Sequence, residues 1–168
     1  MEKYNKYVTM AKSKGMLDEV IISPADICFD IRTQLKCAWG CDRDFMPNAR
    51  CDSRGTTYKE RIQMVKQYRT ILLLHSQDAR QLTKTILELE KAAFLDGYYL
   101  ACALRCCNYC KECQAQNGKD CIHPEKIRPC EVLFGIDFFK TAPKLGLPIE
   151  VLQNKRAAQN RYGFLLID

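Results

Sequence analysis

The sequence predicts an α+β fold, in which helices cover a small, mainly antiparallel sheet and a cysteine-rich lobe binds metal. Short apolar runs typical of strands occur near residues 20, 71 and 164, and segments with helical periodicity separate them. Cysteines gather in two polar stretches, at residues 37–55 and 106–130. Because these stretches hold few apolar residues, we expect metal to organise them as loops.

The chain is expected to begin with a helix and a strand. The helix covers Glu2–Lys14 and stops at Gly15. Its apolar face consists of Tyr4, Tyr7, Val8 and Ala11. Glu19–Ile22 is expected to form a short strand, closed by a turn at Ser23-Pro24. From Ala25 to Lys36 the pattern is mixed, and we expect an extended segment.

The middle of the chain predicts a helix, a strand and a second helix. Thr57 is placed to cap a helix in which apolar residues recur at Tyr58, Ile62 and Val65. Ile71–Leu74 is entirely apolar, as in a central strand that is buried on both faces. The longest helix is expected from about Asp78 to Leu104. Its apolar stripe consists of Leu82, Ile86, Leu89 and Ala93.

The last third of the chain predicts one more helix and one more strand. Pro124 and Pro129 limit any helix after Cys121 to short pieces. Asp137 is placed to cap a helix that ends near Leu145, where Gly146 follows as a stop signal. Tyr162–Ile167 is expected to be the final strand.

Length and composition indicate a single globular domain over residues 1–168. Hydrophobic residues make up 47% and charged residues 27%, which excludes a disordered chain. The longest apolar run, Tyr98–Leu104, is far shorter than the roughly 18 residues of a membrane span. No apolar stretch follows the charged start at Glu2 and Lys3, so we expect no secretory signal and a cytoplasmic protein.

Cysteine is abundant and histidine is scarce. The chain has 11 cysteines, an odd number, and a chain that stays in the cytoplasm would be kept reduced. Metal coordination is therefore the economical explanation for so many thiols. The two histidines argue against a histidine-based catalytic triad. The net charge of +6 is best explained as compensation for metal-bound thiolates, so we expect no nucleic-acid partner.

The sharpest motif is Cys107-x-x-Cys110-x-x-Cys113, followed by Cys121. Three ligands in one tight run with a fourth later are typical of a [4Fe–4S] cluster. A tetrahedral zinc site usually takes two separate Cys-x-x-Cys pairs, a spacing that differs from this motif. Zinc is therefore the second interpretation, and structural thiols that bind no metal are the third. Nearby cations offset the charge of such a site: Lys111, Lys119, Lys126 and Arg128.

The second group is Cys37-x-x-x-Cys41, followed by Cys51 with nine residues between Cys41 and Cys51. A radical-SAM motif is excluded, because its third cysteine would fall at Asp44. Three ligands need a fourth, and Cys130 is the best-placed spare cysteine. A second cluster on these four residues is one hypothesis. The alternative is that Cys37 and Cys41 join the first site or bind nothing.

Several segments resemble the "predicted metal-binding protein" family of anaerobic bacteria and archaea, domain of unknown function 2284. The similar segments are Lys36–Cys41, Ala93–Tyr99, the Cys107 triplet, Cys121–Pro129, Gly135–Asp137, Gly146–Leu152 and Tyr162–Ile167. The resemblance runs from about residue 20 to the C-terminus. It implies metal binding, of the iron–sulfur kind, without implying a particular reaction.

Two positions depart from that family's pattern. The family usually has a cysteine directly before Gly-Ile-Asp, where this chain has Phe134, and prolines after its third N-terminal cysteine, where this chain has Asp52-Ser53. The function we expect is that of an iron–sulfur protein that transfers electrons, or delivers a cluster, to a redox or client protein. One alternative is an interaction module built on structural zinc. Another is an enzyme whose cluster has an open iron, which the missing cysteine at Phe134 would allow.

Overall fold

The computed structural model describes residues 2–41, 55–154 and 157–168. Its centre is a four-stranded sheet with the order β1-β2-β4-β3, in which every neighbouring pair is antiparallel. The strands are β1 (Asp18–Ile22), β2 (Ile71–Ser76), β3 (Cys102–Leu104) and β4 (Arg161–Leu166). The predicted α+β class and antiparallel sheet are confirmed, and the three expected strands are present. The fourth, β3, was not predicted.

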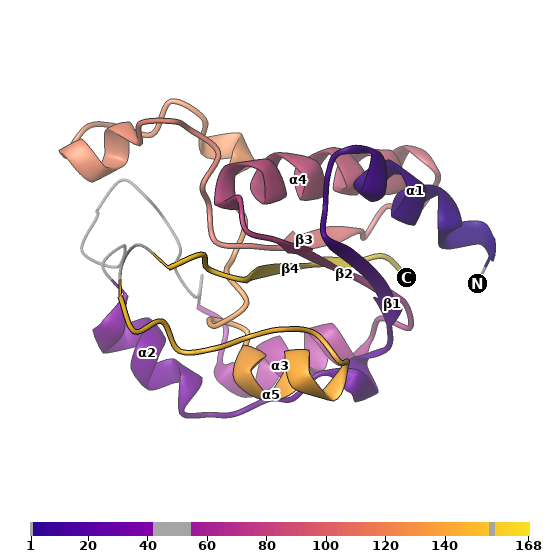
Figure 1. Cartoon of the computed structure of the whole chain (residues 1–168), viewed down its shortest axis with the longest axis horizontal. Helices are drawn as coiled ribbons and strands as arrows, with labels where there is room; N and C mark the ends of the chain where they lie inside the picture. The colour runs from indigo at the N-terminus through magenta and orange to yellow at the C-terminus, as the bar shows by residue number, and fades with distance from the viewer. Residues whose placement is uncertain (1, 42–54, 155–156) are drawn as a thin grey trace.

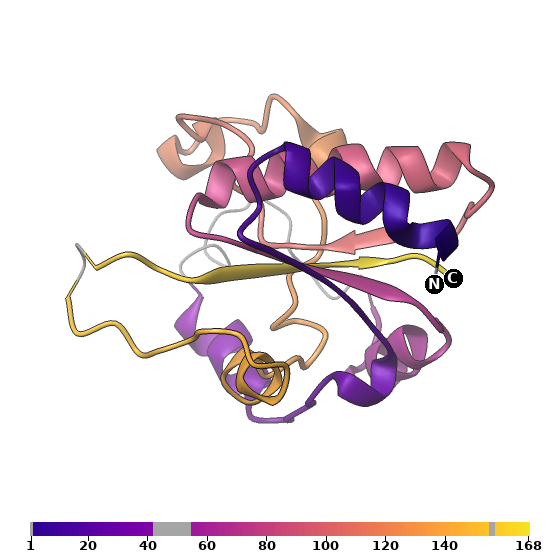
Figure 2. The same ribbon diagram turned by 45° about the vertical axis from the view of Figure 1, so that its right-hand side comes forward.

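Helices cover both faces of this sheet and form three layers (Figure 1). On one face lie α1 (Asn5–Ser13), which follows a short 3-10 turn, and α4 (Ala79–Leu95). On the other lie α2 (Thr33–Gly40), α3 (Tyr58–Lys66) and α5 (Phe138–Lys144). Figure 2 shows the same layers from a second angle.

Both faces of the central strands are buried, as the apolar run at Ile71–Leu74 predicts. Alternate residues of a strand point to opposite faces. Leu72 and Leu74 accordingly pack with the stripe of α4, whereas Ile71 and Leu73 join a second apolar cluster with Val65 of α3. All six residues of β2 are buried. Two separate apolar clusters therefore hold the helices to the sheet.

Helix α4 is shorter than predicted. Its apolar stripe ends at Ala93, and the chain turns at Gly97, where φ is +95°. Glycine adopts this left-handed conformation without the strain that other residues meet. The apolar residues that follow return as β3, in which Ala103 pairs with Leu165 of β4. The expected helix from Asp78 to Leu104 is thus wrong beyond Leu95.

The segment before the first cysteines is helical, which corrects two expectations. Residues 25–36 were expected to be extended and residues 37–55 to form a loop, but a 3-10 turn covers Pro24–Asp26 and α2 reaches Gly40. None of the residues of α2 is buried. Its apolar residues Leu35 and Trp39 face solvent, as does Ile31 just before the helix, and each is more than half exposed. The apolar residues of this helix therefore face away from the core, and the sequence analysis did not predict the helix.

The remaining predicted ends agree with the structure. Gly15 ends the first helix, with φ at +75°. Thr57 forms a reciprocal capping box with Glu60 at the start of α3. The Asp137 side chain accepts a hydrogen bond from the Lys140 amide at the start of α5.

Within the described ranges, no helix has the length and apolar character needed to cross a membrane.

Candidate metal centre

Residues 106–129, the cysteine lobe, form an extension at one end of the molecule. The lobe begins after β3, and it returns at Pro129, whose carbonyl accepts a hydrogen bond from the Arg105 amide at 2.9 Å. Figure 1 shows the first part of the lobe outside the sheet, beyond the N-terminal end of α4, whereas its last part lies against that helix. It contains two short 3-10 helices, η3 (Gln114–Asn117) and η4 (Pro124–Lys126).

Four cysteines of the lobe line one cavity of about 140 Å³. They are Cys107, Cys110, Cys113 and Cys121, and each is partly buried. Other residues also line it: Asn108, Tyr109, Lys111, Gln116 and His123. The structure therefore brings together the four thiols that the motif spacing groups into one site. Their role as metal ligands stays a prediction.

The chain between Cys113 and Cys121 folds back on itself through η3. The Gln116 amide donates to the Cys113 carbonyl at 3.2 Å, which starts the short helix. Gly118 then ends it in the left-handed conformation, with φ at +72°. Ala115 is buried and holds this turn against the rest of the lobe. The turn thereby returns Cys121 to the cavity.

The thiols of this cavity act on one another electrostatically. Burial raises the pKa of Cys110 above its ordinary value, and the neighbouring Cys107, Cys113 and Cys121 raise it further. Lys84 of α4 acts in the opposite direction. Thiolates that repel one another in this way are stabilised when a cation lies among them. The donor set therefore suits a metal ion or a cationic iron core, which displaces the thiol protons.

Two rings lie at the edge of the cavity. Tyr109 and His123 contact edge to face, with 5.2 Å between ring centroids. The Lys84 ammonium lies 5.5 Å from the centre of the Tyr109 ring, which connects this edge to α4. The His123 Nδ1 atom lies 3.9 Å from a carboxylate oxygen of Glu125. These contacts keep both rings beside the thiols, where they cover part of the cavity.

Across residues 2–41, 55–154 and 157–168, no three or more His, Cys, Asp or Glu side chains are arranged so that they could hold a metal ion. In a tetrahedral zinc site the Zn–S distance is about 2.3 Å, which places the sulfur atoms roughly 4 Å apart. The four thiols are grouped instead by the cavity that they line.

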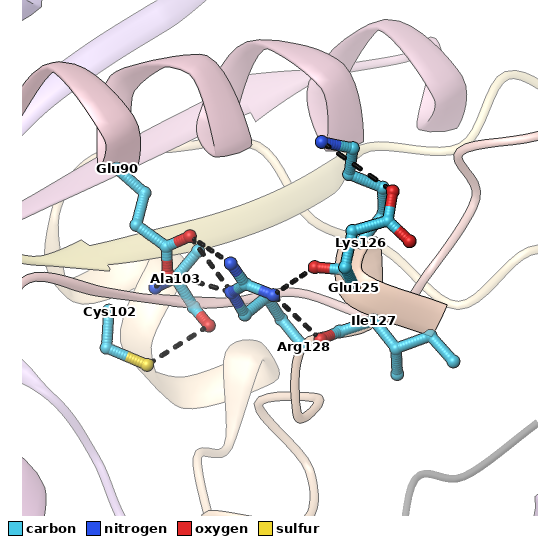
Figure 3. A network of polar contacts seen from close by, with 7 residues as sticks. All are labelled: Glu90, Cys102, Ala103, Glu125, Lys126, Ile127 and Arg128. Atoms are coloured by element: carbon cyan, nitrogen blue, oxygen red, sulfur yellow. Dashed lines mark hydrogen bonds and ion pairs between the residues drawn. The ribbon is translucent and has the colours of Figure 1, made fainter. Parts of the chain in front are cut away.

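An ion pair fastens the cysteine lobe to the body of the protein (Figure 3). The Arg128 guanidinium donates to both carboxylate oxygens of Glu90 on α4, at distances from 2.6 to 2.9 Å. Glu90 also accepts a hydrogen bond from the Ala103 amide of β3 at 2.7 Å. Arg128 Nη1 donates to the carbonyls of Glu125 and Ile127. One arginine therefore connects η4 to a helix and, through Glu90, to a strand.

Sequence reasoning missed this pair and placed Arg128 among the cations around the metal. The sequence feature that could have indicated this ion pair is Glu90. It lies four residues after Ile86, on the side of α4 that is otherwise apolar, and it is only 9% exposed. A buried carboxylate requires a cationic or hydrogen-bonding partner, so an arginine elsewhere in the chain was to be expected there.

The second group of cysteines is only partly within the described residues. Cys37 lies in α2 and Cys41 directly follows it, whereas Cys51 lies outside the described residues. Gln34 of α2 donates to the carbonyls of Val132 and Leu133, and the Leu133 amide donates to the Cys130 sulfur at 3.3 Å. Because Cys37 lies three residues after Gln34, it shares that side of the helix. The structure thus places α2 beside the turn that carries Cys130.

A buried ion pair lies next to that turn. Arg105 Nη1 is 3.5 Å from a carboxylate oxygen of Glu131, and both side chains are at least nine-tenths buried. Burial raises the pKa of Glu131, while Arg105 and the amides of Glu131 and Cys106 oppose the shift. Arg105 also donates to the Tyr162 carbonyl of β4 at 3.3 Å. The backbone next to Cys106 and Cys130 is therefore fixed to the sheet.

Comparison with known proteins gave one match. A family model described as "Predicted metal-binding protein (DUF2284)" matches residues 20–167. The searches of curated proteins and of solved structures found no match. The matched range includes all of the cysteines discussed above and every element from β2 to β4.

Proposed function

Because the chain belongs to this family of predicted metal-binding proteins, we propose that it is a cytoplasmic iron–sulfur protein. Cys107, Cys110, Cys113 and Cys121 would hold a [4Fe–4S] cluster. A bound cluster of this kind accepts and releases single electrons. The protein would then transfer electrons, or deliver the cluster itself, to a redox or client protein.

The observation that carries this proposal is the single cavity lined by the four thiols. A cubane core separates its cysteine sulfurs by the iron and sulfide atoms between them, so its ligands surround a space. A zinc ion would draw the same sulfurs into mutual contact. Three thiols at two-residue intervals and a fourth later also follow the spacing of such clusters. This spacing favours the cluster over zinc.

The surrounding residues have separate tasks in this proposal. Lys84 and Lys111 supply positive charge beside the anionic thiolates. Tyr109 and His123 line the cavity and would limit the access of water to a bound cluster. Arg128 holds the chain that follows Cys121 against α4 through Glu90. Solvent access and nearby charge are two of the factors that set the potential of a cluster.

A second cluster, on Cys37, Cys41, Cys51 and Cys130, belongs to the same proposal. Its support is the contact of α2 with the turn after Cys130, which brings two segments distant in sequence to one place. Arg105 and Glu131 would form a rigid base between the two groups. If the N-terminal cysteines instead support the first site, the protein holds one cluster.

The test is the iron and acid-labile sulfide content of protein purified without oxygen. With two clusters we expect about eight iron atoms per chain, with about four in Cys130→Ser and about four in Cys110→Ser. Cys102→Ala is the matched control, because Cys102 lies in β3 away from the cavity, and it should keep the full content. A starting value of about four that Cys130→Ser leaves unchanged would refute the second cluster. Colourless protein with zinc and no sulfide would refute both.

A further inference from the structure

A second cavity of about 380 Å³ lies between α4 and the cysteine lobe. Its lining residues are Leu87, Glu90, Lys91, Phe94, Ala101, Glu125, Lys126 and Arg128. It shares none of these residues with the cavity of the four thiols. Cavities that hold small molecules in proteins begin at about 300 Å³, so this one has the size of a ligand site.

The arginine in this cavity is held in place but not saturated. Glu90 binds its Nε–H and one Nη2–H, and two carbonyls bind its Nη1–H groups (Figure 3). An arginine has five N–H donors, so one Nη2–H has no partner among the residues that the structure describes. The Arg128 side chain is 30% exposed. A rigid guanidinium with one remaining donor is preorganised to bind an oxygen of a ligand.

Positive charge exceeds negative charge around this cavity by one. Its cations are Lys91, Lys126 and Arg128, and its acids are Glu90 and Glu125. Glu90 is neutralised by Arg128, and Glu125 lies 3.9 Å from the Lys126 ammonium. Lys91 is exposed on α4, and no ion pair joins it to an acid in the described ranges. The excess charge matches a ligand with a single negative charge.

Part of the lining of this cavity is apolar. It consists of Leu87, Phe94 and Ala101, and the Phe94 side chain is 56% exposed although it lies beside partly buried neighbours. Covering exposed apolar surface stabilises a complex in proportion to the area removed from water. A ligand that matches both the excess charge and the apolar lining residues therefore carries an anionic group and an apolar body.

We propose that this cavity binds a small organic carboxylate. The carboxylate would accept hydrogen bonds from Arg128 and from the flanking Lys91 and Lys126, and its apolar body would lie against Leu87 and Phe94. A phosphate monoester carries a second negative charge that this cavity does not offset, and inorganic anions leave the apolar lining residues uncovered. η4 follows directly after His123, so it separates this site from the thiol cavity.

Calorimetric titration of the full chain, purified without oxygen, tests this inference. The probes are 2-naphthoate, the neutral 2-naphthalenemethanol, acetate and inorganic phosphate. We expect 2-naphthoate to bind at least tenfold more tightly than each of the other three. Equal affinity for the neutral alcohol, tighter binding of phosphate, or no heat of binding with 2-naphthoate would overturn the proposal.

Two variants locate the binding. Lys91→Gln removes one cation from an exposed helical position, and it should weaken 2-naphthoate binding about tenfold. Lys59→Gln is the matched control, an exposed lysine of α3 that does not line the cavity, and it should leave the affinity unchanged. Phe94→Ala should weaken 2-naphthoate but not acetate. An unchanged affinity in both Lys91→Gln and Phe94→Ala would contradict this location, whatever the iron content of the protein.

Discussion

Glu90 is a buried acid whose carboxylate serves two partners at once. It accepts hydrogen bonds from the Arg128 guanidinium and from the Ala103 amide, so it joins the cysteine lobe and β3 to α4. The Glu90 and Arg128 side chains are 11% and 30% exposed. Salt screens such a pair less than a surface ion pair. The loss of one partner would leave the other with an uncompensated, poorly hydrated charge.

We therefore expect Glu90→Gln to lower the free energy of unfolding by about 2 kcal/mol. Glutamine keeps an oxygen for the Ala103 amide, so the loss comes mainly from Arg128. Glu88→Gln is the matched control on the same helix, because Glu88 is exposed and, among the residues that the structure describes, its ion pair is with Lys14 at the surface. That control should change stability by less than about 0.5 kcal/mol. Urea unfolding followed by circular dichroism measures both, and equal losses would show that burial of the pair is unimportant.

At the scale of elements, α4 shows which helix boundaries a sequence can reveal. Its start was predictable, because Asp78 accepts hydrogen bonds from the Arg80 and Gln81 amides at 2.8 and 2.9 Å, as the residue type and position suggest. Its end was not, because the apolar residues that follow Gly97 suit a helix as well as a strand. Pairing of β3 with β4, far away in sequence, decides between the two.

Substitutions of Asp78 test how much its side chain stabilises the start of α4. Asp78→Ala should lower the free energy of unfolding by about 1 kcal/mol, whereas Asp78→Asn keeps a capping oxygen and should change it little. The Gln81 amide holds the pKa of Asp78 below its ordinary value, with a smaller contribution from the Arg80 amide. The contribution of Asp78 is thus present above about pH 4 and is lost only as the pH falls further. The difference between Asp78→Ala and wild type should be the same at pH 5 and pH 8, and a clear decrease at pH 5 would contradict this account.

Of the two cysteine groups in the candidate metal centre, the group around Cys107 was easier to predict from sequence than the N-terminal group. The spacing of Cys107, Cys110 and Cys113 depends on local chain geometry, and these thiols do line one cavity with Cys121. The N-terminal group depends on how α2 packs against the turn after Cys130. That packing involves the Gln34 side chain and backbone carbonyls, which leave no pattern in the sequence. Local motifs are therefore predictable from sequence, and contacts between distant segments are not.

At the scale of the whole molecule, the two apolar clusters and the cysteine lobe are separate. No residue of the lobe belongs to either cluster, and Ala115 is its buried apolar residue. Apolar burial therefore contributes little to the order of the lobe, whereas it holds the sheet and its helices together. We therefore expect metal binding to supply the order that apolar burial does not supply.

Loss of metal should consequently affect the lobe and spare the rest of the protein. In Cys110→Ser we expect trypsin to cut within residues 106–129, for example after Lys111 or Lys119, while the far-ultraviolet circular dichroism stays close to that of wild type. Cys102→Ala serves as the control and should resist cleavage there. Collapse of the whole spectrum in Cys110→Ser would show that the sheet also depends on the metal.

The position of β4 at the centre of the sheet has a consequence for the order of folding during synthesis. Ile71 of β2 pairs with Leu166, and Cys102 of β3 pairs with the same residue. When the ribosome has made β1, β2, α4 and the cysteine lobe, β2 therefore still has one edge without a neighbour, and β3 has no partner in the sheet. Such edges are prone to pairing with other chains. A nascent chain arrested before residue 161 would thus expose an apolar edge that the complete chain conceals.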